Sequence, residues 1–144
     1  MKKKLGLLSV LTVMAAVLVC GCVSSKDASF KVGNDTVPSL YSVVGERKLN
    51  GQESGTDNGV TSLKLTYKGG DVTKDDIVKY AQTLQAQGYS VTSGADTTKD
   101  SFDLQLGKQS VDAGSVLLME ISYEFGNNAE ITYRVGQGII TQNQ

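Results

Sequence analysis

Alternation between apolar and polar residues is the feature that most constrains this fold. In residues 117–125, a segment that ends with Phe125, every second side chain is apolar and those between are mostly polar. The same period of two recurs in residues 60–67, 102–106 and 129–135. Because successive strand residues point to opposite faces, this period predicts strands with one buried and one solvent-facing side. Short turns between the strands favour antiparallel pairing.

One segment follows a helical period instead. Thr73 can cap the free backbone N–H groups of a helix start, and Asp75 and Asp76 lie in its first turn, where the helix dipole favours negative charge. Gly88 is placed to end the helix near Gln87. The apolar residues recur at helical spacing at Ile77, Tyr80, Ala81 and Leu84. Such a stripe must be buried, so we predict an α+β fold with one amphipathic helix packed on an antiparallel sheet of about five or six strands.

Three further segments carry weaker signals. Residues 40–44, which follow Pro38, have strand-like composition, and residues 89–92 predict a short strand. Residues 50–59 are polar with recurring glycines, which predicts a mobile loop. Val116 and Leu118 make the longest strand apolar on both faces. This favours a central strand partly covered by the N-terminal segment or by a loop; the alternative is an exposed apolar patch that docks a partner.

The N-terminus indicates export. Three lysines follow Met1, and an apolar run then extends to Val19. A positive start followed by an apolar run is typical of a secretory signal peptide. The run ends in Val19-Cys20-Gly21-Cys22 and is followed by polar residues.

This ending resembles the lipobox of bacterial lipoproteins, in which a small residue precedes the modified cysteine. The resemblance implies a diacylglyceryl group on Cys22, which becomes the mature N-terminus and anchors the protein in the membrane. Cys20 is the competing position, but the bulky Val19 precedes it. The other alternative is an uncleaved transmembrane helix over residues 5–22, which is at the lower limit of length for a span.

The predicted organisation has three parts: a signal peptide over residues 1–21 that is removed, a lipidated cysteine and flexible tether over 22–36, and a single extracytoplasmic α+β domain over 37–144. Cleavage leaves 123 residues and takes away three lysines, so the net charge falls from −1 to −4. With Cys22 modified, the mature chain has no thiol for a disulfide bond or for a cysteine nucleophile.

The chain also resembles small uncharacterised lipoproteins of Gram-positive bacteria. That resemblance is carried by the lipobox, by the stretch 43–48 and by the capped helix that leads into Gly88-Tyr89. It extends over about residues 1–135 and implies no particular activity.

Composition excludes several kinds of chemistry. The chain has no histidine and no basic excess, so histidine-based catalysis and nucleic-acid binding are not expected. Residues 68–71 lack the pattern of a phosphate loop, and the aspartates lack the spacing of a calcium loop. We therefore predict no catalytic residues, no metal site and no cofactor. The tyrosines are expected mostly in the core.

The functional prediction is a membrane-tethered, non-enzymatic binding or adaptor module on the outer face of the cytoplasmic membrane, with an envelope protein as the expected partner. An inhibitor or sensor domain that acts through the loop 50–59 is a second hypothesis. A small hydrolase is a third.

Overall fold

The computed structural model describes residues 22–141. The predicted signal peptide over residues 1–21, including Cys20, lies outside the described residues, as does nearly all of the alternative transmembrane segment over 5–22. No helix within residues 22–141 is long and apolar enough to span a membrane. The elements are β1 Ser29–Val32, β2 Asp35–Pro38, α1 Leu40–Val44, β3 Leu49–Asp57, β4 Val60–Tyr67, α2 Lys74–Ala86, β5 Ser90–Ser93, β6 Ser101–Gln109, β7 Ser115–Glu124 and β8 Ala129–Gln137.

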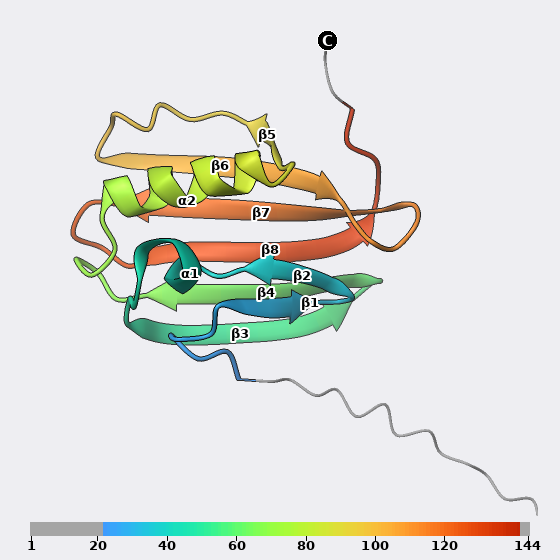
Figure 1. Cartoon of the computed structure of the whole chain (residues 1–144), viewed down its shortest axis with the longest axis horizontal. Coiled ribbons are helices and arrows are strands. Elements are labelled where there is room, and N and C mark those ends of the chain that lie inside the picture. Colours follow the sequence, from blue (N-terminus) through green and yellow to red (C-terminus); the bar gives the residue numbers. More distant parts are fainter. Residues whose placement is uncertain (1–21, 142–144) are drawn as a thin grey trace, which may run out of the picture.

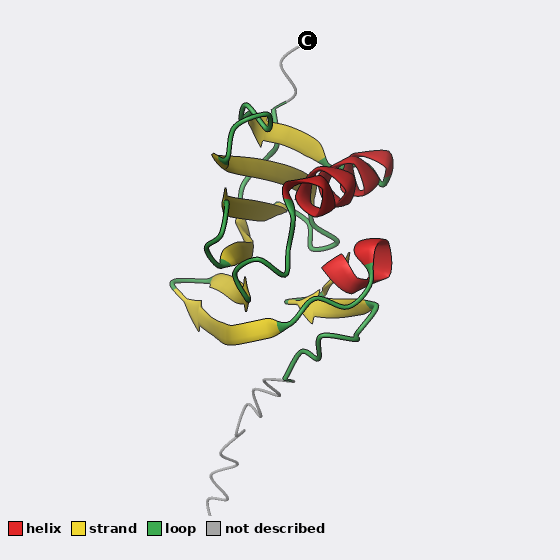
Figure 2. Cartoon of the chain, turned by 90° about the vertical axis from the view of Figure 1, so that its left-hand side faces the viewer, coloured by secondary structure: helices red, strands yellow, loops and turns green. Residues whose placement is uncertain are grey.

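Six strands form one antiparallel sheet in the order β3-β4-β8-β7-β6-β5. The strands from β5 to β8 pair consecutively, whereas β4 pairs with the distant β8, from Thr61 opposite Val135 to Tyr67 opposite Ala129. β1 and β2 form a separate hairpin. The two helices and this hairpin all lie over one face of the sheet (Figure 1). The opposite face carries neither helix (Figure 2).

The α+β class and its antiparallel sheet are confirmed, and so is the predicted helix. Thr73 caps α2 in a capping box: its hydroxyl accepts from the Asp76 N–H, and the Asp76 carboxylate accepts from the Thr73 N–H. The helix ends at Ala86, and the positive φ of 93° at Gly88, which follows the cap residue Gln87, lets the Tyr89 N–H bond back to the Leu84 carbonyl.

The covered face holds the core, and most of the tyrosines contribute to it, as predicted. Tyr80 and Tyr133 are fully buried, and the Tyr80 hydroxyl donates to the Pro38 carbonyl at 2.7 Å. The single hydroxyl proton of Tyr80 is then used, so Tyr133 is the donor in the 2.9 Å bond between the two hydroxyls. Tyr67 and Tyr89 are also buried, and Tyr41 is partly exposed. Every buried side-chain nitrogen and oxygen within the described range has a hydrogen-bond partner.

The predicted tether over residues 22–36 is wrong from Ser29 onward. Phe30, Val32 and Val37 of the β1–β2 hairpin are buried, and the Phe30 ring packs edge-on against Tyr133 with centroids 4.8 Å apart. At the hairpin turn, Asp35 is 5% exposed and accepts from the Ser110 hydroxyl at 2.6 Å and from a backbone N–H at 3.0 Å. The folded domain therefore begins well before residue 37. β1 and β2 have four residues each, so an alternating pattern in the sequence is too short to predict them.

Residues 40–44 form the short helix α1 and not a strand. The Ser39 hydroxyl accepts from the Ser42 N–H at 3.2 Å, which caps the first turn, and Gly45 ends the helix with φ 83°. The strand-like composition of this segment is outweighed by these local signals on either side of it.

The predicted mobile loop 50–59 is also wrong, because residues 49–57 form the edge strand β3. The turn is confined to Asn58 and Gly59, both with positive φ (49° and 77°), as the tight hairpin turn to β4 requires. An Asn-Gly pair before an alternating strand is a strong hairpin signal, and the neighbouring glycines obscured it.

Two details of β7 differ from expectation. Phe125 lies beyond the end of the strand and is 73% exposed, so it does not extend the buried row. Val116 is buried and Leu118 half-buried, as a covered central strand requires, but the cover is the C-terminal segment and not the N-terminal one. A Cβ added at Gly138 would meet the Val116 side chain, and one added at Gly107 would meet Ile140 and Leu118.

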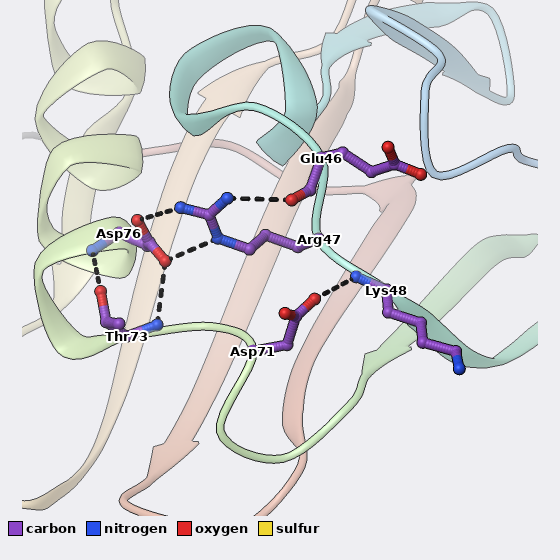
Figure 3. A network of polar contacts seen from close by, with 6 residues as sticks. All are labelled: Glu46, Arg47, Lys48, Asp71, Thr73 and Asp76. Carbon is purple, nitrogen blue, oxygen red and sulfur yellow. Dashed lines mark hydrogen bonds and ion pairs between the residues drawn. The ribbon is translucent and has the colours of Figure 1, made fainter.

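An ion pair joins the linker after α1 to the start of α2 (Figure 3). The Arg47 guanidinium donates to both carboxylate oxygens of Asp76, at 2.8 and 2.9 Å. Burial opposes ionisation of Asp76, but the hydrogen bonds from Arg47 and Thr73 outweigh it and lower the pKa of this carboxyl below its ordinary value. The Lys48 N–H donates to Asp71 nearby. This network fixes the segment 43–48 against the capped helix.

Candidate binding groove

The open face of the sheet is hollowed into a groove of about 830 Å³. The residues that line it come from six strands, and the register places the polar ones of neighbouring strands in common rows; Gln105 lies opposite Glu120, which lies opposite Thr132. The lining consists of Glu53, Ser54, Gly55, Thr56, Asp57, Ser62, Lys64, Ser93, Asp103, Leu104, Gln105, Glu120, Ile121, Ser122, Glu130, Thr132 and Arg134. This volume falls within the range of small-ligand sites.

Ion pairs and hydrogen bonds order the floor of the groove. The Glu120 carboxylate is held between the Arg134 guanidinium and the Gln105 side-chain amide, whose nitrogen donates at 3.1 Å. The side-chain oxygen of Gln105 in turn accepts from the Thr92 hydroxyl at 2.7 Å. Two of the lining side chains on adjacent strands are thereby fixed in orientation, and no ligand is needed to order them.

Negative charge is in excess along the groove. Five of the lining residues are carboxylates and two are cations. Lys64 pairs with Glu130 at 3.0 Å, and Arg134 pairs with Glu120. Among the described residues, the remaining carboxylates have no ion-pair partner; they are Glu53, Asp57 and Asp103. The groove is therefore an anionic surface whose two cations are already neutralised.

The segment 50–59 contributes to this site in a form that sequence analysis did not anticipate. Its residues 53–57 line the groove as part of β3, where pairing with β4 holds them. The segment suggested as the contact of an inhibitor or sensor domain thus lines this groove as an ordered strand.

Cys22, the predicted lipidation site, stands at the beginning of the described chain and is not one of the residues that line the groove. It is exposed and its thiol is free. The neighbouring Val23 is partly buried against the core, and its N–H donates to the Gln52 side chain at 2.9 Å.

The residues of the groove floor were visible in the sequence only as the polar side of each strand. Asp103, Gln105, Glu120, Glu130 and Arg134 have nothing in their spacing that distinguishes them from an ordinary solvated face. The signal that unites them is the strand register, which no single strand contains.

A second hollow of about 600 Å³ lies between β5, β7 and the C-terminal segment. It is lined in part by Val91, Val116, Leu118, Ile139 and Ile140. The C-terminal segment that covers Val116 thus leaves some apolar surface open. Within residues 22–141, no group of three or more cysteine, aspartate or glutamate side chains is placed to hold a metal ion.

Comparison with protein-family models and with curated proteins finds no match for this chain. The geometry of the groove and the sequence of the N-terminus therefore carry the functional proposal.

Proposed function

We propose that this protein is a lipid-anchored, extracytoplasmic binding module that holds a cationic polypeptide segment of an envelope partner in its groove. The observation that carries the proposal is the row of carboxylates along the open sheet face, three of them without an ion-pair partner among the described residues. The anchor is proposed from the resemblance of Val19-Cys20-Gly21-Cys22 to a lipobox.

Charge selects the class of ligand. Lysine and arginine side chains form charge-assisted hydrogen bonds with carboxylates, and complementary charge also speeds encounter. An anionic ligand would meet the repulsion of the carboxylates in excess. A sugar would lack a stacking surface, because no described residue that lines the groove is aromatic. A basic polypeptide segment is the ligand that these side chains suit best.

The proposal is binding and not catalysis. A nucleophilic serine needs an adjacent base within hydrogen-bond reach. Lys64, the lysine of the lining, contacts Glu130 instead. The carboxylates of the open face are directed to solvent and to the two cations.

Calorimetric titration with a synthetic peptide tests the groove. The acylated mature protein in detergent is titrated at low salt with an octapeptide of alternating lysine and serine. We expect binding that weakens as salt is added, because exposed charges are screened. Neutralising three carboxylates, each worth up to about 1 kcal/mol, is expected to weaken binding about tenfold or more. The groove variant combines Glu53→Gln, Asp57→Asn and Asp103→Asn.

A control variant changes the net charge by the same amount outside the groove. It combines Asp75→Asn, Asp100→Asn and Glu124→Gln. It is expected to bind nearly as the unaltered protein does. Equal loss in both variants would show that net charge and not the groove attracts the peptide. Equal binding of a peptide with glutamate in place of lysine would contradict the proposed ligand class.

The anchor is tested separately, by the intact mass of the N-terminal peptide isolated from the native membrane fraction. A diacylated or triacylated Cys22 is the expected result. A peptide that begins with unmodified Met1 would contradict the anchor and leave the groove proposal standing.

A further inference from the structure

The segment that follows Cys22 is bound to the domain from its first residue. The Val23 N–H donates to Gln52 on β3, and the Val23 side chain is partly buried against the core. A turn comes next, in which the Ser24 N–H donates to the Asp27 carboxylate at 2.7 Å and the Asp27 N–H to the Ser24 carbonyl at 3.1 Å. The contacts of Val23 attach this segment directly to the sheet edge, and the turn is closed by its own hydrogen bonds.

Further contacts hold the rest of the segment. Lys26 pairs with Glu46 at 3.6 Å, and the Ser25 hydroxyl donates to the same carboxylate at 3.4 Å. The Ala28 carbonyl accepts from the Ser39 N–H at 3.0 Å. Residues 23–28 therefore follow the surface of the domain, and no residue between Cys22 and β1 serves as a spacer.

Consecutive Cα atoms are about 3.8 Å apart, so an acylated Cys22 lies within one residue of the folded surface. The headgroup layer on each side of a bilayer is about 5–7 Å thick, and the acyl chains must lie beneath it. A cysteine whose acyl chains are in the hydrocarbon cannot stand far above this layer. The surface around Val23 must then be at the headgroups as well.

We propose that the domain rests directly on the membrane, with the β3 edge of the sheet against the lipid headgroups. This inference rests on the proposed acylation of Cys22. In Figure 1, the described chain begins below β3, whereas β5 forms the opposite edge of the sheet. Beside the Lys26–Glu46 pair, the β3 strand carries the carboxylates Glu53 and Asp57, which have no ion-pair partner among the described residues, so the lipid anchor and not charge attraction brings this edge to the bilayer.

This placement narrows the choice of partner. Strands in a sheet are about 4.8 Å apart, so β5, five spacings from β3, lies no more than about 24 Å from the anchored edge. The groove lies between these edges. Its ligand is therefore a cationic polypeptide segment within that distance of the outer face of the bilayer.

Fluorescence quenching from the membrane surface tests the placement. Single cysteines are introduced at Asn50 on β3 and at Lys99 near the opposite edge, and each is labelled with the same fluorophore; the Cys22 thiol is blocked by its lipid. The acylated protein is reconstituted in phosphatidylglycerol vesicles that contain a lipid with a nitroxide headgroup. We expect loss of most of the fluorescence at position 50 and little loss at position 99.

A linker variant provides the matched control. Eight glycine and serine residues inserted between Cys22 and Val23 give a spacer of about 16 Å root-mean-square length. The quenching at position 50 is expected to fall toward that at position 99, with acylation unchanged. Circular dichroism verifies that the labelled proteins and the linker variant are folded.

Two results would overturn the inference, and they differ in what else they affect. Equal quenching at both positions in acylated protein that floats with the vesicles would refute the seating of the β3 edge and leave the anchor intact. Protein that neither floats nor carries the acyl mass would refute the anchor and the seating together.

Discussion

The two faces of the sheet are built from the same strands but differ in burial and polarity. On β8, Ile131 and Tyr133 are fully buried beneath the covering elements, whereas Thr132 and Arg134, which alternate with them, line the open groove. The covered face consists of apolar side chains and of hydroxyls bonded to one another. In the groove, the open face consists mostly of carboxylates, amides and hydroxyls, and three of the carboxylates have no ion-pair partner among the described residues. Beside the C-terminal segment, the same face carries the apolar Val116 and Leu118.

The two faces differ in how much their side chains stabilise the fold. Burial of apolar surface stabilises the covered face by about 1.5–3 kcal/mol for each large side chain. Exposed ion pairs such as Glu120–Arg134 contribute about 0–1 kcal/mol. Side chains of the groove can therefore change with little effect on the fold, whereas those beneath the helices cannot.

Alkaline pH should disrupt the covered face most severely. Burial raises the pKa of Tyr67 and of Tyr89 to about 12, and it also raises the pKa of Tyr80 and Tyr133. The pKa of these tyrosines in the folded protein exceeds the unfolded value of about 10, so the folded state favours the neutral side chains. Their contribution to the free energy of unfolding is complete below pH 10 and is lost as pH rises toward 12. We expect unfolding in this window, with tyrosinate absorbance and circular dichroism changing together. Ionisation of all tyrosines near pH 10 with the fold retained would contradict this.

Adjacent substitutions on β8 should separate the two faces. Ile131→Ala removes a fully buried side chain and is expected to lower the free energy of unfolding by about 2–5 kcal/mol. Thr132→Ala, on the open face, is expected to change it by no more than about 0.5 kcal/mol. Urea denaturation of both variants measures the contrast. Equal losses would mean that the open face is covered in solution.

The tie between the β1–β2 hairpin and the β6–β7 turn should have an intermediate effect. Asp35→Ala leaves the buried Ser110 hydroxyl and the Val111 N–H without their acceptor, at an expected cost of about 1–3 kcal/mol. Asp112→Ala, which removes only an exposed contact with Asn34, is the control. Both are measured by denaturant unfolding. If Asp35→Ala left the free energy of unfolding unchanged, the result would favour the flexible tether that the sequence predicts for this region.

The smallest effect on stability is expected in the groove. Arg134→Gln removes an ion pair whose side chains are both more than 40% exposed, so the free energy of unfolding should change by less than about 1 kcal/mol. The same change frees Glu120 for a cationic ligand, so the lysine peptide should bind more tightly by calorimetry. Weaker binding would indicate that Arg134 itself contacts the ligand.

Much of the covered face could be predicted from the sequence, because burial leaves a periodic pattern. Strands β4 to β8 and helix α2 were all recognisable, β5 as the short strand predicted at residues 89–92, and so was the capping residue Thr73. β1, β2 and α1 escaped because four or five residues give only a weak period. β3 escaped because most of it is exposed, so it carries no apolar alternation.

The groove could not be predicted to the same extent. A solvent-facing position on one strand resembles any other, and a polar surface shared by several strands leaves no period in the sequence. Glu120 and Arg134 are 14 residues apart in the sequence and become neighbours only through the pairing of β7 with β8. The excess of carboxylates depends on a further pairing, that of β3 with β4.

The pairing of β4 with β8 has a consequence for the order in which the protein can fold. β5 to β8 pair with their neighbours along the chain and can assemble locally, but β4 needs a partner about 70 residues away. Closing so long a loop is entropically costly and slows folding. A chain that emerges from a ribosome or a membrane channel with its N-terminus first cannot complete its sheet until its last strand has followed.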